Sequence, residues 1–301
     1  MNVVLELGHK LKEGVKVNEP LALHTSWEVG GPADYFLCPV NVNEVIEIIR
    51  FSRQHNLPLQ IIGNGSNLLV RDGGIRGLVV KIGDSFCYLQ CKDDLLIVGA
   101  GTPMTYVARV AAEEALCGCE FMVGIPGSLG GAIIMNAGSF GGYIGEKVSS
   151  VKLVSLEGEA LVLDKEQLSF AYRWSNLLGK GVIAEASIQL ERGNKEESLK
   201  KMDYFLAERL RRHPSLPSAG SVFRNMPEQP AGRLIESAGA KGMRVGGAEV
   251  STKHANFIVN RGDATAIDIL TLMDKVRNMV KEKFDIELQP EVKVVGEEIK
   301  E

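Results

Sequence analysis

Apolar residues recur every three or four positions in several segments, a pattern typical of amphipathic helices that bury one face. These segments are residues 43–55, 104–116, 195–213 and 263–284, with a shorter one at 231–239. In the segment 195–213, Met202 and Leu210 share the apolar face, and Pro214 ends the helix because proline cannot continue it. Pro103 suits the first turn of its helix, and Asp263 is a candidate N-cap.

Short apolar runs bounded by glycine and asparagine predict strands between these helices. The predicted extended segments are residues 57–63, 68–82, 87–101, 148–156, 159–164, 181–190 and 243–260. We expect turns at Gly73-Gly74 and at Lys92–Asp94, and a hairpin at Glu157-Gly158. The pattern predicts a small α/β lobe up to about residue 83 and then a mixed lobe with antiparallel strands.

The segment from Gly124 to Gly145 departs from both patterns. It contains eight glycines in twenty-two residues and no charged side chain. Glycine allows positive φ and a close approach of the main chain to a ligand. The composition is too apolar for a flexible linker and too rich in glycine for an ordinary helix or strand. We therefore expect main chain folded against a large flat or phosphorylated molecule.

A second candidate ligand loop, Gly63–Asn67, follows a predicted strand. Position 68 is leucine, so the third glycine of a Rossmann fingerprint is missing, and no Gly-Lys-Ser/Thr triplet marks a nucleoside-triphosphate loop. Consecutive small residues can still form an anion-binding nest, with Ser66 and Asn67 adding side-chain donors. Alone, the loop is as typical of a tight turn without a ligand. Together with the glycine-rich segment, it indicates a dinucleotide site.

Composition and charge exclude several classes of protein. The formal net charge of −4 gives no polycationic surface, so nucleic acid is not an expected partner, and no obligate protein partner is implied. No apolar run reaches the ~18 residues of a membrane span. Residues 1–15 carry charges and no cleavage site, so a signal peptide is not expected. The five cysteines lack zinc or redox spacing, which predicts free and mostly buried thiols, no metal site and a cytoplasmic location.

Seven sequence blocks, in order, resemble the UDP-N-acetylenolpyruvoylglucosamine reductases (UDP-N-acetylmuramate dehydrogenases). They are HTSWEVGGPADYF (24–36), GNGSNLLV (63–70), GIPGSLGGAIIMNAG (124–138), AYRWS (171–175), GSVFRN (220–225), AGRLIESAGAKGMRVGGAEVSTKHANFIVN (231–260) and QPEVKVVG (289–296). The first three are similar to the wider class of vanillyl-alcohol-oxidase-type FAD domains, and the last four to the reductases alone. Only residues 174–220 separate Arg173 from Ser221, which resembles the compact subtype without an extra substrate-covering segment.

The resemblance implies non-covalent FAD, with its pyrophosphate held by the two glycine-lined stretches and its flavin near Asn136. The residues implied in cofactor binding are Gly63, Asn64, Gly65, Ser66, Asn67, Leu68, Gly124, Ile125, Pro126, Gly127, Ser128, Gly131, Ala132, Asn136, Ala137 and Gly138. NADPH is the implied hydride donor, which reduces FAD and leaves before the enolpyruvyl substrate enters the same cleft. The implied product is UDP-N-acetylmuramate, a precursor of bacterial peptidoglycan.

Three residues are implied in the second half of the reaction. Hydride addition to the terminal methylene carbon leaves negative charge on the neighbouring carbon and its carboxylate, so the site needs cationic stabilisation and a proton donor. By resemblance, Arg173 holds the carboxylate, Glu291 assists from the other side, and Ser221 delivers the proton. Without the resemblance, Arg173 is also consistent with a surface arginine, Ser221 with a turn hydroxyl and Glu291 with the end of a strand.

Four further residues are implied in substrate contact. Tyr172, Asn225 and His254 stand at motif positions that contact substrate in relatives, and Lys293 is a weaker candidate for the UDP pyrophosphate. His254 is also consistent with a structural histidine. Met226 stands where relatives usually have proline, a departure that bears on how rigidly the preceding motif is held.

We therefore expect an α+β fold, with a two-lobed FAD-binding module of the vanillyl-alcohol-oxidase type and a C-terminal α/β substrate-binding domain. The expected limits are 1–195 for the module, with lobes of about 1–83 and 84–195, and 196–301 for the substrate domain, whose last strand at about 289–296 returns to the flavin cleft. One alternative is another FAD oxidoreductase of this fold, acting on an alcohol or sugar. Such enzymes often bind flavin covalently through histidine or cysteine, and neither occurs in 124–145. A second alternative, a non-catalytic nucleotide-binding module, would have no use for a proton donor.

Overall fold

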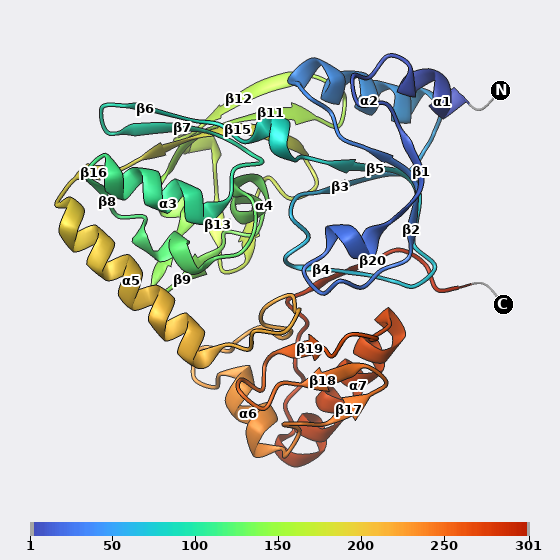
Figure 1. Ribbon diagram of the computed structural model, residues 1–301, viewed down its shortest axis with the longest axis vertical. Helices are drawn as coiled ribbons and strands as arrows, with labels where there is room; N and C mark the ends of the chain where they lie inside the picture. Colours follow the sequence, from blue (N-terminus) through green and yellow to red (C-terminus); the bar gives the residue numbers. More distant parts are fainter. Residues whose placement is uncertain (1–2, 300–301) are drawn as a thin grey trace. The chain divides into compact units, whose positions relative to one another are not determined.

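The protein is described here by a computed structural model that covers residues 3–299 (Figure 1). The first two residues of the segment considered for a signal peptide, and the last two of the predicted substrate domain, lie outside this range. The chain forms two compact units that are interleaved in sequence. Unit 1 consists of Met1–Val17, Tyr35–Asn64 and Gly77–Arg209, and unit 2 of Asn18–Asp34, Gly65–Arg76 and Leu210–Glu301.

Helices and strands are mixed along the chain. The helices are α1 (Val3–Gly8), α2 (Val42–Gln54), α3 (Met104–Glu113), α4 (Leu129–Ile134), α5 (Lys195–Arg212), α6 (Ala231–Ser237) and α7 (Ala266–Phe284). The strands are β1 (Lys16–Pro20), β2 (Pro32–Leu37), β3 (Leu59–Ile62), β4 (Leu68–Val70), β5 (Ile75–Lys81), β6 (Leu89–Lys92), β7 (Leu95–Gly99), β8 (Leu116–Cys117), β9 (Gly138–Ser139), β10 (Gly142–Tyr143), β11 (Val148–Ser155), β12 (Ala160–Asp164), β13 (Phe170–Ala171), β14 (Trp174–Ser175), β15 (Gly181–Gln189), β16 (Glu191–Arg192), β17 (Arg244–Val245), β18 (Ala248–Val250), β19 (Ile258–Asn260) and β20 (Lys293–Val295). Short 3-10 helices are η1 (Leu21–His24), η2 (Asp84–Phe86), η3 (Glu120–Gly124), η4 (Ile144–Glu146) and η5 (Lys165–Gln167).

The antiparallel sheet of unit 1 has the strand order β12-β11-β15-β7-β6 (Figure 1). Val154 pairs with Ala160, which confirms the hairpin predicted at Glu157-Gly158. Lys92 pairs with Leu95, so the turn predicted between β6 and β7 is also confirmed. The sequence pattern therefore described this part of the fold well.

A second sheet has the order β1-β2-β5-β3, and its β3 and β5 are parallel. The helix predicted at 43–55 is α2, which begins after Asn41 because the side chain of that residue accepts a hydrogen bond from the amide of Glu44. The chain passes from one unit to the other within β1, β2 and β5.

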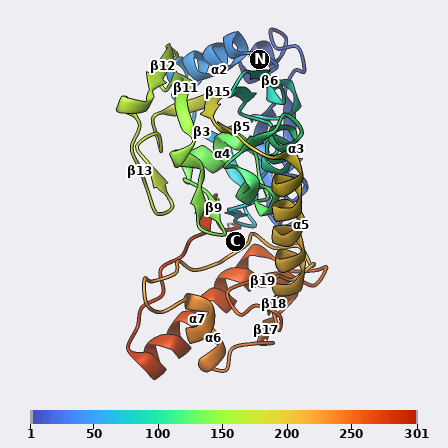
Figure 2. The same ribbon diagram turned by 90° about the vertical axis from the view of Figure 1, so that its left-hand side faces the viewer.

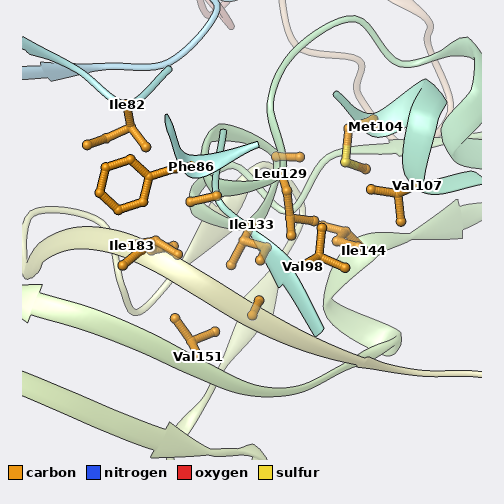
Figure 3. Packing of buried hydrophobic residues seen from close by; sticks show 14 of the residues in the cluster. Ile82, Phe86, Val98, Met104, Val107, Leu129, Ile133, Ile144, Val151 and Ile183 are labelled. Carbon is orange, nitrogen blue, oxygen red and sulfur yellow. The ribbon is translucent and has the colours of Figure 1, made fainter. Parts of the chain in front are cut away.

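Part of the core of unit 1 lies between the antiparallel sheet and the helices α3 and α4. Val98 from β7, Met104 and Val107 from α3, and Leu129 and Ile133 from α4 are all buried in it (Figure 3). Each such side chain contributes about 1.5–3 kcal/mol when fully buried. The helix α4 corrects the expectation for the glycine-rich segment, which contains a short helix after all.

Gly130 explains how a helix forms in a segment so rich in glycine. A Cβ at this position would lie 3.0 Å from the Cβ of Ala100, just after β7. The amides of Leu129 and Gly130 donate to the carbonyls of Thr102 and Ala100, at 2.9 and 2.8 Å. The absence of a side chain therefore lets the first turn of α4 bind directly to the end of the sheet.

In unit 2, α7 packs against β17 and β18 of the sheet β17-β18-β19, and α6 packs against α7 (Figure 2). The predicted cap at Asp263 is wrong, because α7 begins at Ala266 with Thr265 as its N-cap. The two carboxylate oxygens of Asp72 accept hydrogen bonds from the amides of Ala266 and Ile267. This distant carboxylate satisfies the first turn of α7, which a local sequence pattern does not reveal.

The strands predicted on either side of Gly73-Gly74 belong to different sheets. β4 pairs in parallel with β20 (Lys293–Val295), whereas β5 pairs with β3.

Within residues 3–299, no helix is long and apolar enough to cross a membrane. The five cysteines form no disulfide among the described residues, but only Cys119 is buried, so the expectation of mostly buried thiols is wrong.

Candidate active site

The two predicted cofactor segments meet within unit 1 at Gly63 and Ser128. A Cβ at Gly63 would lie 2.4 Å from the Oγ of Ser128, and a Cβ at Gly131 would lie 3.7 Å from the same oxygen. Two glycines therefore keep side chains away from this hydroxyl. Ser128 precedes α4, but its side chain makes no capping hydrogen bond to the helix. The hydroxyl is thus not used to start the helix.

The other residues predicted to bind the cofactor lie along the same two stretches. Asn64, Gly65, Ser66 and Asn67 form the loop after β3, Leu68 begins β4, Gly124 ends η3, Ile125, Pro126 and Gly127 lead to α4, Ala132 lies in α4, and Ala137 and Gly138 follow Asn136 into β9. The unit boundary passes between Asn64 and Gly65, so the loop contributes residues to both units.

Gly65 is required by the protein's own backbone. Its φ is +63°, and a Cβ there would lie 2.1 Å from the carbonyl oxygen of His24. Its carbonyl accepts a hydrogen bond from the amide of Ser26 at 3.3 Å. The sequence interpretation assigned this glycine to the cofactor, with a tight turn without a ligand as the alternative for the loop, and the structure shows that packing within unit 2 already demands a glycine here.

We expect Gly65→Ala to destabilise the protein by at least ~2 kcal/mol, because it combines a left-handed backbone with a clash against main chain. Gly239→Ala is the matched control in the same unit, since Gly239 has φ +86° and no atom within 4 Å of an added Cβ. Denaturant unfolding should therefore show a larger loss for Gly65→Ala than for Gly239→Ala. Equal losses would mean that the contact with His24 relaxes at no cost.

Arg173 lies at the tip of a short hairpin in unit 1. β13 and β14 pair Ala171 with Trp174, which leaves Tyr172 and Arg173 as the two loop residues. Arg173 has a φ of 53°, and its guanidinium carbon lies 5.0 Å from the centre of the Tyr172 ring. A left-handed conformation is unfavourable for a residue with a long side chain, so the hairpin must be held by its surroundings.

Asn136 holds this hairpin to the glycine-rich segment. Its Nδ2 donates to the carbonyl of Ala171 at 3.0 Å, and its Oδ1 accepts from the amide of Gly145 at 3.0 Å. On the opposite strand, Ser175 donates through Oγ to the carbonyl of Ile134 at 2.9 Å. The end of the predicted cofactor segment and the predicted catalytic arginine are therefore parts of one hydrogen-bonded structure.

Ser221 and Glu291 lie on neighbouring stretches of chain in unit 2. The amide of Glu291 donates to the carbonyl of Val222 at 2.8 Å, and Phe223 pairs with Pro290 in an antiparallel bridge. Glu291 is buried, with an exposed fraction of 8%, and Ser221 is half-buried. The structure therefore brings together two residues that are seventy positions apart in sequence (291 − 221).

The loop after β3 is hydrogen-bonded to the segment that carries Glu291. Asn67 donates through Nδ2 to the carbonyl of Glu291 at 3.3 Å, and its own carbonyl accepts from the amide of Lys293 at 3.0 Å. The side chain of Lys293 is exposed. Asn67, which the resemblance assigns to FAD, thus also fixes the segment that carries Glu291 and leads into β20.

Two of the residues predicted to bind substrate also make hydrogen bonds within the protein. Asn225 accepts a hydrogen bond through Oδ1 from the amide of Ala231, at the start of α6, at 3.1 Å. His254 accepts one through Nδ1 from the amide of Asn256 at 3.2 Å. Burial lowers the pKa of His254, so its ring is neutral at neutral pH. With Nδ1 accepting, the proton of the neutral ring lies on Nε2.

Comparison with known proteins identifies both parts of the chain. A sequence model described as FAD binding domain matches residues 33–164, and one described as UDP-N-acetylenolpyruvoylglucosamine reductase, C-terminal domain, matches residues 212–295. The UDP-N-acetylenolpyruvoylglucosamine reductases of Lachnoclostridium phytofermentans and Caldanaerobacter subterraneus subsp. tengcongensis are 46% and 45% identical to this chain. The alignments cover 95% and 98% of this chain and 94% and 98% of the relatives. The chain belongs to the UDP-N-acetylenolpyruvoylglucosamine reductase family.

The fold agrees with that of a solved member of the family. The crystal structure of UDP-N-acetylenolpyruvylglucosamine reductase from Thermus caldophilus matches with a TM-score of 0.79 and 36% identity, over 93% of this chain and 97% of that one. The expected α+β fold, with an FAD-binding module and a C-terminal domain of this family, is therefore confirmed.

Sequence reasoning missed the residues that hold the candidate site together. Asn256 and Ser175 lie inside the motifs quoted for the family, yet neither was singled out, and Asn136 was assigned only to the flavin. A buried asparagine in an apolar stretch such as Asn256-Phe-Ile-Val is the signal that could have found one of them, because a buried amide needs hydrogen-bond partners. The partners themselves are distant in sequence.

Proposed function

We propose that this chain is an NADPH-dependent flavoprotein that reduces UDP-N-acetylenolpyruvoylglucosamine to UDP-N-acetylmuramate in the synthesis of peptidoglycan precursors. The observation that carries the proposal is its relationship to named reductases of this activity at 46% identity over 95% of the chain. The match to an FAD binding domain supports the cofactor.

The residues of unit 1 fit a dinucleotide. Gly63 and Gly131 leave space beside the Ser128 hydroxyl, which can donate a hydrogen bond to a pyrophosphate oxygen. Residues 124–145 contain no histidine or cysteine that could bind flavin covalently, which supports non-covalent FAD. When bound, FAD supplies the two-electron chemistry by taking a hydride from NADPH and giving it to the methylene carbon of the substrate.

The three predicted catalytic residues supply what the remaining chemistry needs. The planar guanidinium of Arg173 matches a carboxylate in a two-bond geometry and stabilises the charge that develops next to it. Ser221 delivers a proton to the neighbouring carbon, and the buried Glu291 assists from the other side. The amide of Glu291 donates a hydrogen bond to the carbonyl of Val222, the residue after Ser221, which supports a shared role for Ser221 and Glu291.

The substrate contacts follow from the environments of the other predicted residues. The neutral ring of His254 offers its Nε2–H as a hydrogen-bond donor, and the exposed ammonium of Lys293 suits a pyrophosphate. Tyr172 and Asn225 complete the set through their positions in the motifs. We place the reaction in the cytoplasm, where free thiols such as those of the five cysteines persist and NADPH is supplied. The partners are small molecules, with no nucleic acid.

Anaerobic stopped-flow spectroscopy of the purified protein tests the proposal. We expect a yellow protein whose flavin is bleached by NADPH and then reoxidised by UDP-N-acetylenolpyruvoylglucosamine. Acid precipitation should release all of the flavin into the supernatant. A colourless protein that gains no FAD on titration, or a reduced flavin that the enolpyruvyl sugar nucleotide does not reoxidise, would contradict the proposal. Flavin retained on the precipitated chain would favour the alcohol or sugar oxidoreductase instead.

A further inference from the structure

The side chain of Asn256 is buried beside the segment that carries Ser221. Its exposed fraction is 1%, and that of Phe223 is also 1%. Both ends of the amide are used: Oδ1 accepts from the amide of Phe223 at 3.0 Å, and Nδ2 donates to the carbonyl of Phe223 at 2.8 Å. One side chain thus satisfies both polar groups of a single buried residue, as a neighbouring strand would do.

The main chain of Asn256 extends this contact. Its carbonyl accepts a hydrogen bond from the amide of Val222 at 2.8 Å, and its amide donates to Nδ1 of His254. On the other side of the same segment, the carbonyl of Val222 accepts from the amide of Glu291. The residues directly after Ser221 are therefore held between Asn256 on one side and the segment of Glu291 on the other.

We propose that Asn256 is a positioning residue, whose side-chain amide sets the placement of Ser221 and, through Val222, of Glu291. It touches neither the cofactor nor the reacting atoms in this role. The inference rests on the proposed function, because it assigns Ser221 and Glu291 to the reduction of the substrate. The effect needs no intermediate side chain, because Asn256 makes its hydrogen bonds directly to the main chain of Phe223, in the segment that follows Ser221.

The expected consequence of losing this amide follows from the burial of its partners. Without it, the amide and carbonyl of Phe223 remain buried and lose their hydrogen bonds, so the segment must shift to recover them. A misplacement of about 1 Å in catalytic geometry can lower a rate by about 100-fold. NADPH reduces the flavin before Ser221 is needed, so the two half-reactions should respond differently.

The first measurement is the rate of each half-reaction in Asn256→Ala, by anaerobic stopped-flow spectroscopy. We expect reduction by NADPH to stay within about 2-fold of the wild-type rate, and reoxidation by the enolpyruvyl substrate to fall roughly 10- to 100-fold. If the wild-type protein itself fails to be reoxidised, the proposed function is wrong. If the wild-type protein is reoxidised normally and Asn256→Ala slows both half-reactions equally, or neither, the positioning role is wrong.

Asn260→Ala is the matched control for a buried asparagine in the same unit. Asn260 is 4% exposed, donates through Nδ2 to the carbonyl of Trp27, and accepts through Oδ1 from the amides of Gly262 and Ala264. We expect this variant to lose stability without a selective loss of reoxidation. A selective loss as large as that of Asn256→Ala would show that any weakening of unit 2 has the same effect, and would overturn the proposal.

Asn256→Asp supplies a pH-dependent rescue. A protonated carboxyl can both accept from the amide of Phe223 and donate to its carbonyl, whereas the carboxylate can only accept. Burial raises the pKa of such a carboxyl. We therefore expect the reoxidation rate, divided by that of the wild-type protein, to rise as the pH falls through this pKa. A flat ratio between Asn256→Asp and wild type would count against the role.

Amide hydrogen exchange in the protein before substrate is added gives a readout independent of turnover. In Asn256→Ala we expect faster exchange at the amides of Phe223 and Glu291 than in Asn260→Ala. Unchanged exchange at Glu291 would show that Asn256 does not act on that residue, even if the activity falls.

Discussion

Ser221→Ala is expected to leave the reduction of the flavin by NADPH close to normal and to slow its reoxidation by the enolpyruvyl substrate by about 10²- to 10⁴-fold, the range typical of a lost general acid. The reason is that, in the proposed mechanism, the hydroxyl supplies the proton only after the hydride has been transferred to the substrate. The measurement is anaerobic stopped-flow absorbance of the flavin in two separate mixing experiments.

Ser218→Ala is the control for this prediction, because Ser218 lies three residues upstream. The Oγ of Ser26 donates a hydrogen bond to the main-chain carbonyl of Ser218, which the substitution keeps. Ser218→Ala should change neither half-reaction. A Ser221→Ala variant that loses both half-reactions equally would argue for a structural role in the segment after Gly220. A variant that loses neither would support the interpretation of Ser221 as an ordinary turn hydroxyl.

Arg173→Asn is expected to slow the reoxidation step by about 10²- to 10³-fold, the usual loss when a donor to developing negative charge is removed. The same substitution should not lower the free energy of unfolding, because Arg173 has a φ of 53° and asparagine tolerates this conformation better than arginine. Rapid-mixing kinetics and urea unfolding on the same preparation test both halves of the prediction.

Arg192→Asn is the comparison for Arg173→Asn within unit 1. Arg192 lies in β16, and its Nη1 donates to the carbonyl of Glu114 at 3.4 Å. We expect no selective loss of reoxidation there. If Arg173→Asn were as active as the wild-type protein, Arg173 would be the surface arginine that its sequence context alone also allowed.

The helices were accessible from sequence because their signal is local. The apolar spacing of 195–213 places α5, observed at Lys195–Arg212, almost to the residue. Pro214 ends the helix, and the charged residues mark its polar face, without contacts to distant residues. The hairpin at Glu157-Gly158 was accessible for the same reason, since a short turn that contains glycine between β-prone runs is a short-range signal.

The features that were missed depend on contacts between distant residues. α4 forms in the glycine-rich segment because Gly130 packs on Ala100, and α7 starts at Ala266 because Thr265 and Asp72 cap it. The pairing of β4 with β20 joins residues 68–70 to residues 293–295, more than two hundred positions further along the sequence. None of these contacts leaves a periodic pattern in the segment concerned.

The candidate site shows the same division. The motifs named Arg173, Ser221 and Glu291, but residue types alone could not show that Arg173 lies at the tip of a two-residue loop. β13 and β14 are two residues each, too short for an alternating pattern to be recognised. Residue types alone also could not show that the side chain of Asn67 supports Glu291 and that the side chain of Asn136 supports the Arg173 hairpin.

The interleaving of the two units limits how the gene can be divided. The core of unit 2 includes Trp27 and Leu69, both fully buried, and the indole of Trp27 donates to the carbonyl of Ile258 at 2.7 Å. A fragment that starts at Leu210 lacks both of these side chains and would leave their places in the core unfilled. The C-terminal part therefore cannot be transferred alone to another protein with its core complete, because unit 2 also needs the segments Asn18–Asp34 and Gly65–Arg76.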